Sequence, residues 1–172
     1  MDENQVTANL TTLMNEVWEA RMRADPIFAT MCGGHRYNDR LPHVSEAATQ
    51  DWLAQLMSYR ERLDATDQAG LAQDAHLTYQ CLARELDEEI ADLSFGLRRM
   101  PLARAFGFHQ TFSDLPLYTP FQATEDYERY LARLQGLPAY IDGYLDLMRY
   151  GLQTGHVQPR VAMEGVDRSV RE

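Results

Sequence analysis

The 172-residue chain carries 26 acidic and 16 basic residues, which gives a formal net charge of −10. Because this excess of negative charge repels a phosphate backbone, the composition argues against a nucleic-acid partner. Every basic residue is arginine, so the sequence contains no Schiff-base lysine, phosphate-loop lysine or Ser-Lys dyad. A chain of this length can bury one sizeable core, and we therefore expect a single helical unit spanning residues 1–172.

The sequence predicts neither a signal peptide nor a membrane span. The first twenty residues carry acids where a secretory signal peptide carries bases, and no stretch approaches the roughly 18 apolar residues of a membrane span. Two widely separated cysteines, Cys32 and Cys81, are typical of free thiols in a reducing compartment. We therefore expect a cytoplasmic protein without a membrane partner.

Helical periodicity dominates the first hundred residues. A helix over residues 5–24 should bury Leu10, Leu13, Met14, Val17 and Trp18. Asp25-Pro26 predicts a short second helix, because aspartate caps a helix and proline suits its first position, and Gly33 and Gly34 should end it. Ser45 predicts the N-cap of another helix, which should bury Leu53, Leu56, Met57 and Leu63. Its antiparallel partner carries an apolar stripe of Leu71, Ala75, Tyr79, Leu82, Leu86, Ile90, Leu93 and Leu97.

Residues 101–123 interrupt this pattern with three prolines, four phenylalanines and no sustained period, which predicts an ordered aromatic-rich loop. Thr124 should start a helix that buries Tyr127, Tyr130, Leu131 and Leu134. Pro138 should open the next helix, with an apolar stripe of Ile141, Tyr144, Leu145, Met148 and Leu152. One more amphipathic pattern starts in the tail after residue 157. The predicted fold is all-α, an irregular bundle of about five to six helices with a long aromatic and proline-rich loop.

Patterns that carry catalysis or bind metal are incomplete in this sequence. Cys32, His35 and His43 offer three zinc ligands in one segment, but nothing nearby supplies a fourth. The sequence has no His-Glu-x-x-His, no pair of Glu-x-x-His helices and no Gly-x-Ser-x-Gly elbow. The helical spacing of the tyrosines between residues 127 and 150 favours packing over an aromatic substrate wall. We therefore predict no catalytic residue, no metal ligand and no cofactor within this chain.

Residues 36–40 crowd polar groups into a turn where helix packing does not require them. Tyr37, Asp39 and Arg40 are therefore candidate substrate-binding residues. A purely structural interpretation is equally open, in which Asn38 and Asp39 form an Asx turn while Arg40 pairs with Asp39 or with a helix C-terminus.

Four motifs resemble one bacterial family. They are Asp-Pro-x-x-Ala-Thr from Asp25, Gly-x-His-x-Tyr-x-Asp-Arg-Leu-Pro from Gly33, Tyr-x-x-Arg-Leu-x-x-x-Pro-x-Tyr from Tyr130, and GLQTGHVQPR from Gly151. Their order resembles the N-terminal part of the family catalogued as domain of unknown function 885. Members look like all-helical, zinc-dependent peptidases with a His-Glu helix and then Pro-Gly-His in their C-terminal half. This sequence lacks that motif, and His43 stands where the family carries an acid.

The resemblance implies a non-catalytic N-terminal helical portion of a larger metal-dependent peptidase, either a natural truncation or a fragment. It would form one wall of a substrate cleft, and zinc would belong to the full-length family. The expected partners are the missing C-terminal catalytic half or another protein chain, and a peptide substrate. Tyr37, Asp39 and Arg40 would then orient the peptide or brace the missing half. The alternative is a free-standing helical protein-interaction module with residues 106–121 as its contact surface.

Overall fold

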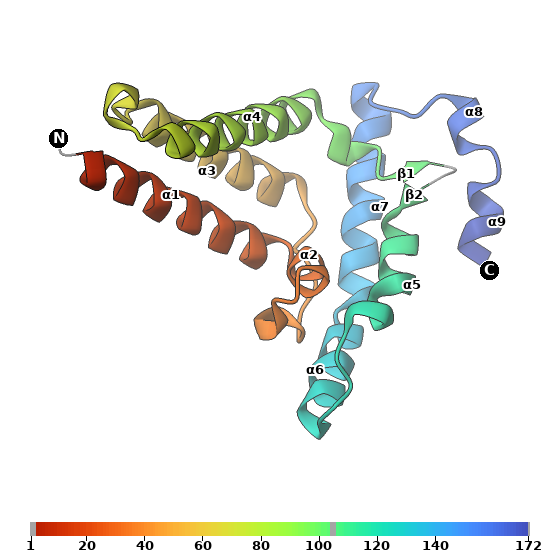
Figure 1. The fold of residues 1–172 in the computed structure, drawn as a ribbon. Helices are drawn as coiled ribbons and strands as arrows, with labels where there is room; N and C mark the ends of the chain where they lie inside the picture. Colours follow the sequence, from red (N-terminus) through yellow and green to blue (C-terminus); the bar gives the residue numbers. More distant parts are fainter. Residues whose placement is uncertain (1–2, 104–105, 172) are drawn as a thin grey trace. The chain divides into compact units, whose positions relative to one another are not determined.

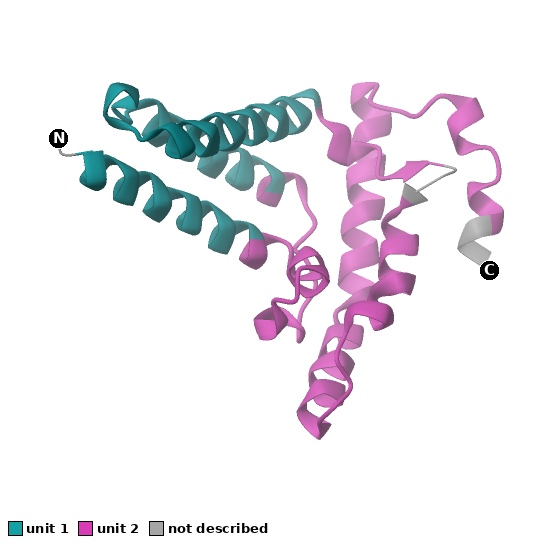
Figure 2. Ribbon diagram, in the orientation of Figure 1, with its two compact units in different colours: residues 1–21, 49–95 teal, residues 22–48, 96–172 magenta. Residues whose placement is uncertain are grey.

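The computed structural model describes residues 3–103 and 106–171. They form helices α1 to α9, three short 3₁₀ turns and one two-stranded ribbon, so the predicted all-α class is confirmed (Figure 1). The chain divides into two compact units (Figure 2). Unit 1 comprises residues 1–21 and 49–95, and unit 2 comprises residues 22–48 and 96–172. The expected single unit over residues 1–172 stays a prediction.

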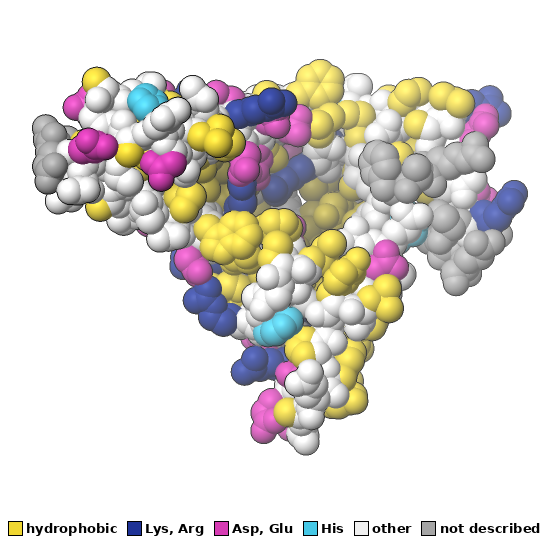
Figure 3. Space-filling model, viewed as in Figure 1, with side chains coloured by type: hydrophobic (Ala, Val, Ile, Leu, Met, Phe, Trp, Pro, Cys, Tyr) yellow, Lys and Arg dark blue, Asp and Glu magenta, His cyan; other side chains and the backbone are white. Residues whose placement is uncertain are grey.

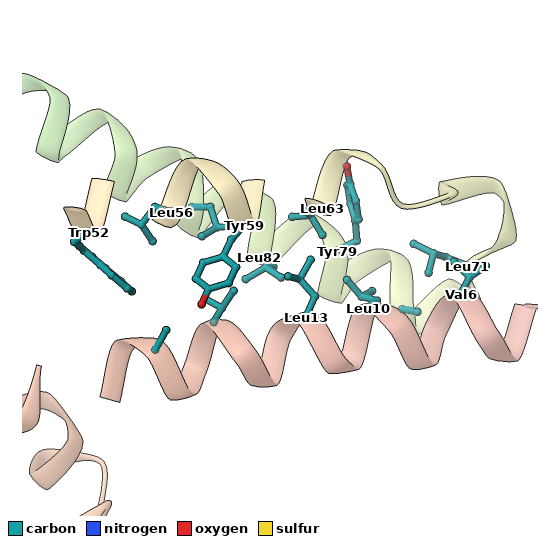
Figure 4. Packing of buried hydrophobic residues seen from close by; sticks show 14 of the residues in the cluster. Val6, Leu10, Leu13, Trp52, Leu56, Tyr59, Leu63, Leu71, Tyr79 and Leu82 are labelled. Atoms are coloured by element: carbon teal, nitrogen blue, oxygen red, sulfur yellow. The ribbon is translucent and has the colours of Figure 1, made fainter. Parts of the chain in front are cut away.

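Unit 1 is built from α1 (Glu3–Ala24), α3 (Glu46–Asp64) and α4 (Gln73–Phe95), with the turn η2 (Gln68–Gly70) between the last two. Arg60 Nε lies 2.7 Å from Asp87 Oδ1, and Trp52 Nε1 lies 2.7 Å from Glu89 Oε1. The residue later in α3 (Arg60) thus contacts the residue earlier in α4 (Asp87). The two helices are therefore antiparallel, as predicted. One apolar cluster fills the space between the three helices (Figure 4).

The buried faces of α1 and α3 differ in part from the predicted ones. Met14, Trp18 and Met57 are exposed, whereas the stripe buried along α1 consists of Val6, Leu10, Leu13, Val17 and Ala20, with Met22 also buried near its end. Those buried along α3 include Trp52, Leu56, Tyr59 and Leu63. Both sets follow alternating steps of four and three residues, so each is one continuous stripe. The stripe of α4 is confirmed from Leu71 to Leu93, while Leu97 lies beyond the helix and is exposed.

Unit 2 begins with the short helix α2 (Pro26–Met31) and the turn η1 (His35–Tyr37). The Asp25 carboxylate accepts hydrogen bonds from the backbone N–H groups of Ile27 and Phe28, both at 3.0 Å. Gly33 adopts a φ of 80°, a left-handed conformation that favours glycine. The predicted cap and stop of this helix are thus confirmed. Ser45 Oγ likewise accepts from the Ala48 N–H at 3.0 Å, which confirms the N-cap of α3.

The rest of unit 2 is mostly helical. Strand β1 pairs antiparallel with β2, with Leu102 opposite Gly107 and Ala103 opposite Phe106. In chain order the elements are η3 (Leu97–Arg99), β1 (Leu102–Ala103), β2 (Phe106–Gly107), α5 (Phe108–Tyr118), α6 (Thr124–Gln135), α7 (Leu137–Thr154), α8 (Arg160–Met163) and α9 (Val166–Arg171). Helices α8 and α9 are separate because Gly165, with a φ of 87°, breaks the single amphipathic pattern expected in the tail.

The predicted loop over residues 101–123 is wrong for its central part, which forms α5. Phe108, Phe112, Leu115 and Thr119 recur in steps of four, three and four residues, and Leu115 is fully buried. The Phe108 ring stacks on Tyr144 with centroids 4.2 Å apart. Pro116 lies in the last turn, where it removes one backbone hydrogen bond without preventing the preceding turns. The prolines of this segment therefore favoured the prediction of a loop, although a short amphipathic helix forms there.

The predicted buried sides of α6 and α7 are also partly wrong. On α6, Tyr127 and Leu131 are exposed, and the fully buried residue is Arg133. On α7, Tyr140, Leu147 and Gly151 are buried, whereas Leu152 is 71% exposed. A Cβ atom added at Gly143 would lie 2.3 Å from the Val44 carbonyl oxygen. Helix α7 therefore packs through the large side chains of Tyr140 and Leu147 and, at Gly143, through close approach of the neighbouring backbone.

Candidate functional site

The predicted binding residues lie in a short turn that follows α2. The Gly34 N–H donates to the Ala29 carbonyl at 2.7 Å and closes the end of that helix. The chain then forms η1, and the Arg40 N–H donates to the Tyr37 carbonyl at 3.2 Å. We call residues 35–40 the clasped segment, because a buried arginine from α6 holds them.

Arg133 holds the clasped segment through backbone carbonyl groups. Its Nε donates to the Arg40 carbonyl at 2.9 Å, and its Nη2 donates to the Tyr37 carbonyl at 2.8 Å. Nη2 also lies 3.0 Å from Thr30 Oγ1 on α2. The side chain of Arg133 is fully buried. One guanidinium therefore ties α6 to both α2 and the clasped segment.

A chain of polar contacts continues from this guanidinium. Thr30 Oγ1 donates to Asn38 Oδ1 at 2.7 Å, and both residues are buried. Asn38 Nδ2 lies 3.4 Å from His35 Nδ1. Arg129, one helical turn before Arg133, donates from Nη1 to the His35 carbonyl at 3.4 Å. The clasped segment is thus bonded to α6 at both of its ends.

Burial lowers the pKa of Arg133 from its ordinary value, while Asp39, Tyr130 and Asp25 act in the opposite direction. An arginine still keeps its proton at neutral pH, since its ordinary pKa is above about 12. No ion pair joins Arg133 to a carboxylate within the described part of the chain, and its Nη1 is buried without a hydrogen-bond partner there. Among the described residues, the groups that accept hydrogen bonds from its guanidinium are neutral oxygen atoms.

The structure brings together the three predicted binding residues. Tyr37 and Asp39 are half-buried, and Arg40 is exposed. Arg40 Nε lies 3.3 Å from Asp39 Oδ1, so the structural pairing proposed for these two residues is confirmed. The guanidinium carbons of Arg36 and Arg40 lie 5.7 and 5.4 Å from the centre of the Tyr37 ring. A role of these side chains in binding substrate stays a prediction.

Arg133 is the residue that periodicity missed, because a charged residue is not counted as part of a buried stripe. Two signals could have identified it. It is three residues after Tyr130, hence on the same side of α6, and it is the arginine of the Tyr-x-x-Arg-Leu-x-x-x-Pro-x-Tyr motif. Asn38 was considered only as a turn residue, although its side chain is almost completely buried.

The described residues also bear on metal binding and membrane insertion. No group of three or more His, Cys, Asp or Glu side chains that could hold a metal ion occurs among residues 3–103 and 106–171. Cys32, His35 and His43 are therefore not brought together as ligands. In the same ranges no helix combines the length and apolar character needed to cross a membrane. Cys32 and Cys81 are free, exposed thiols. Cytoplasmic location stays a prediction.

Most of this sequence matches the model of a known protein family. The model of a family described as bacterial protein of unknown function (DUF885) matches residues 26–172. No curated protein and no solved structure matches the chain. The matched range includes α2, the clasped segment and α6, and thus every contact of Arg133 described above. Since the match covers most of the sequence, the chain belongs to the DUF885 family of bacterial proteins of unknown function.

Proposed function

We propose that this chain is a non-catalytic helical portion of a metal-dependent peptidase or related hydrolase, and that its clasped segment forms part of one wall of a peptide-binding cleft. Tyr37, Asp39 and Arg40 are the proposed contact residues. Zinc and the catalytic residues would be supplied by the His-Glu and Pro-Gly-His motif that the family resemblance implies. That motif does not occur in the 172-residue sequence.

The observation that supports this role is the clasp itself. Arg133 bonds to the carbonyl groups of Tyr37 and Arg40, so the backbone is held from its buried side. The side chains of Asp39 and Arg40 remain 42% and 56% exposed. A rigid backbone that presents accessible polar side chains loses little conformational entropy on binding.

The chemistry of the three side chains suits a peptide. A carboxylate accepts from peptide N–H groups, a guanidinium donates to peptide carbonyls, and a phenol ring offers an apolar face with a polar edge. The same groups could brace another protein segment, which also presents peptide groups. We favour the substrate because the three residues belong to one short, firmly held turn.

The test has two parts. The isolated chain with added zinc should not hydrolyse a mixed peptide library, and steady turnover would contradict the non-catalytic role. In ¹⁵N-resolved NMR titrations, members of the library should shift the amide signals of residues 37, 39 and 40. Arg40→Ala should weaken that binding, whereas Arg149→Ala, on an exposed part of α7, should not. Peptide binding that leaves residues 35–40 unperturbed would overturn the proposed site.

One observation favours the alternative of a helical interaction module. Leu117 at the end of α5 is 80% exposed, and Tyr118 beside it is also exposed. Figure 3 shows other apolar side chains (yellow) that reach the surface. However, Phe108 and Phe112 of the proposed contact surface pack inside unit 2. Leu117→Ser should abolish binding to a protein partner if the module interpretation is right and leave peptide binding by residues 37–40 unchanged.

A further inference from the structure

Arginines gather around the clasped segment. Arg36 and Arg40 belong to it and lie on the Tyr37 ring, while Arg129 and Arg133 reach it from α6. Residues 129 and 133 are one helical turn apart, so their side chains lie on the same side of α6. Arg129 bonds at the His35 end of the segment, and Arg133 bonds at the Tyr37 and Arg40 carbonyls. The positive groups therefore extend along the whole segment.

Within the described ranges, Arg129 and Arg133 are bonded to neutral oxygens and not to carboxylates, in contrast to several other arginines. Six other arginines each form an ion pair with at least one carboxylate of their own: Arg21, Arg60, Arg62, Arg84, Arg99 and Arg149. Around the clasped segment, Arg40 pairs with Asp39. Arg129 and Arg133 bond to neutral oxygens and form no ion pair within the described ranges. Of Arg40, Arg129 and Arg133, only Arg40 thus has a carboxylate at ion-pair distance among the described residues.

Four guanidinium groups along one short segment contrast with the chain as a whole, whose net charge is −10. Asp39 and Asp25 act electrostatically on Arg133 but form no ion pair with it in the described residues. A buried cation adds a fixed positive potential that solvent screens only weakly. An anionic group that approaches this acidic protein would therefore be favoured here.

We propose that the clasped segment binds a carboxylate of the peptide, with Arg40 and Arg129 as hydrogen-bond donors and the buried Arg133 as a fixed source of positive charge. This rests on the proposed function, which supplies the peptide. A guanidinium matches the two oxygens of a carboxylate with parallel N–H groups, and such charge-assisted bonds are stronger than neutral ones. The half-buried Tyr37 ring, against which Arg40 lies, would contact the part of the peptide next to the carboxylate.

The carboxylate has two sources, the C-terminus of a peptide and an acidic side chain. Three probes separate them: an N-acetylated alanine peptide as the free acid, its C-terminal amide, and the amide with one central glutamate. Binding is measured with the whole chain from the NMR signals of the Arg40 and Arg129 Nε–H groups. We expect the free acid to bind about tenfold more tightly than its amide, since charge-assisted hydrogen bonds are lost with the charge. Tight binding of the glutamate peptide would identify the side chain as the source.

Arg129→Gln should reduce the free-acid preference about tenfold, while the exposed control Arg149→Gln should leave it unchanged. Arg129 is exposed, so its replacement should not disturb folding, which circular dichroism would verify. Equal binding of all three probes at residues 35–40 would overturn the carboxylate proposal and leave the proposed peptide site standing. Binding of the free acid elsewhere on the chain would overturn both.

Discussion

The interior of unit 1 and the interior of unit 2 are stabilised by different kinds of interaction. Unit 1 contains a continuous apolar cluster contributed by α1, α3 and α4. Unit 2 has a smaller apolar cluster, centred on Ile27, Leu115 and Tyr140, and in addition a buried polar network centred on Arg133. Apolar burial is non-directional and tolerates some repacking, whereas a buried hydrogen-bond network requires every partner.

The polar side chains of the two units also have different roles. The polar side chains at the surface of unit 1 mostly join its helices, as Arg60 does with Asp87 and Arg62 with Glu16. In unit 2 the network is used to fix a non-helical turn whose backbone carbonyls at residues 37 and 40 bond to one guanidinium. A directional network specifies one backbone conformation, which suits a segment that must present side chains in a fixed arrangement.

The apolar basis of unit 1 can be tested with Leu86→Ala. Leu86 is fully buried on α4, so its truncation removes apolar contacts and leaves a cavity. We expect a loss of about 2–5 kcal/mol in the free energy of opening of unit 1, measured by native-state hydrogen exchange of its amides. Leu77→Ala, on the same helix but 65% exposed, is the control and should cost less than about 0.5 kcal/mol. Similar losses at both positions would mean that apolar burial does not dominate in unit 1.

The polar basis of unit 2 can be tested with Arg133→Met, which keeps much of the length of the side chain but removes every donor. The carbonyls of Tyr37 and Arg40 then lose their buried partner, at a cost of about 1–3 kcal/mol for each group left unsatisfied. Amides of residues 35–40 should exchange faster, and the exposed Arg149→Met should have no effect there. Arg133→Lys keeps the charge without the planar fork, so it should also loosen the segment. Unchanged exchange in Arg133→Met would show that the clasp does not order the segment.

The close packing of α7 against Val44 can be tested at Gly143. Alanine is normally favoured over glycine in a helix by about 1 kcal/mol. At Gly143, however, a Cβ atom would lie 2.3 Å from the Val44 carbonyl oxygen and 2.9 Å from the Val44 Cβ. We expect Gly143→Ala to destabilise unit 2 by about 1–3 kcal/mol, as overpacking does. Ala139→Gly at an exposed position of the same helix should show the ordinary preference for alanine. Stabilisation by Gly143→Ala in thermal unfolding would contradict the close packing.

The same contrast explains which parts of the structure could be predicted. The stripe from Leu71 to Leu93 and the caps at Asp25 and Ser45 are local patterns, and the structure confirms them. Helix α5 was not predicted because its apolar stripe spans only three turns and the helix contains Pro116, a residue typical of loops. Local patterns fail where a tertiary partner decides the outcome.

The candidate site was predictable to a similar, partial extent. The unusual polar residues of the turn identify Tyr37, Asp39 and Arg40 as candidate binding residues from the sequence alone. The carbonyl groups that bond to the buried Arg133 lie 93 and 96 positions earlier in the chain, and no periodicity encodes such a partner. The turn and Arg133 lie in two different motifs that resemble the family, but the sequence alone does not show that they are in contact.

The smallest expected effect concerns two tyrosines of unit 2. Burial raises the pKa of Tyr140, as do its hydrogen bond with Tyr144 and the charges nearby, and burial also raises the pKa of Tyr144. With a raised folded-state pKa, the stabilisation is fully present below the unfolded pKa of about 10 and is lost as the pH rises toward the folded value. Unit 2 should therefore lose about 1.4 kcal/mol per pH unit for each such tyrosine above about pH 10.

Tyr140→Phe should reduce this slope by one tyrosine's contribution, because one titrating group is removed while the ring remains packed. The measurement is the free energy of unfolding at a series of pH values between about 9 and 11.5, a range that begins below the ordinary tyrosine pKa of about 10. Tyr127→Phe on the exposed face of α6 serves as the control for loss of a phenolic hydroxyl. If Tyr140→Phe leaves the slope of unfolding free energy against pH unaltered, ionisation of this buried residue is not what destabilises unit 2 at high pH. Another titrating group would then account for the loss of stability.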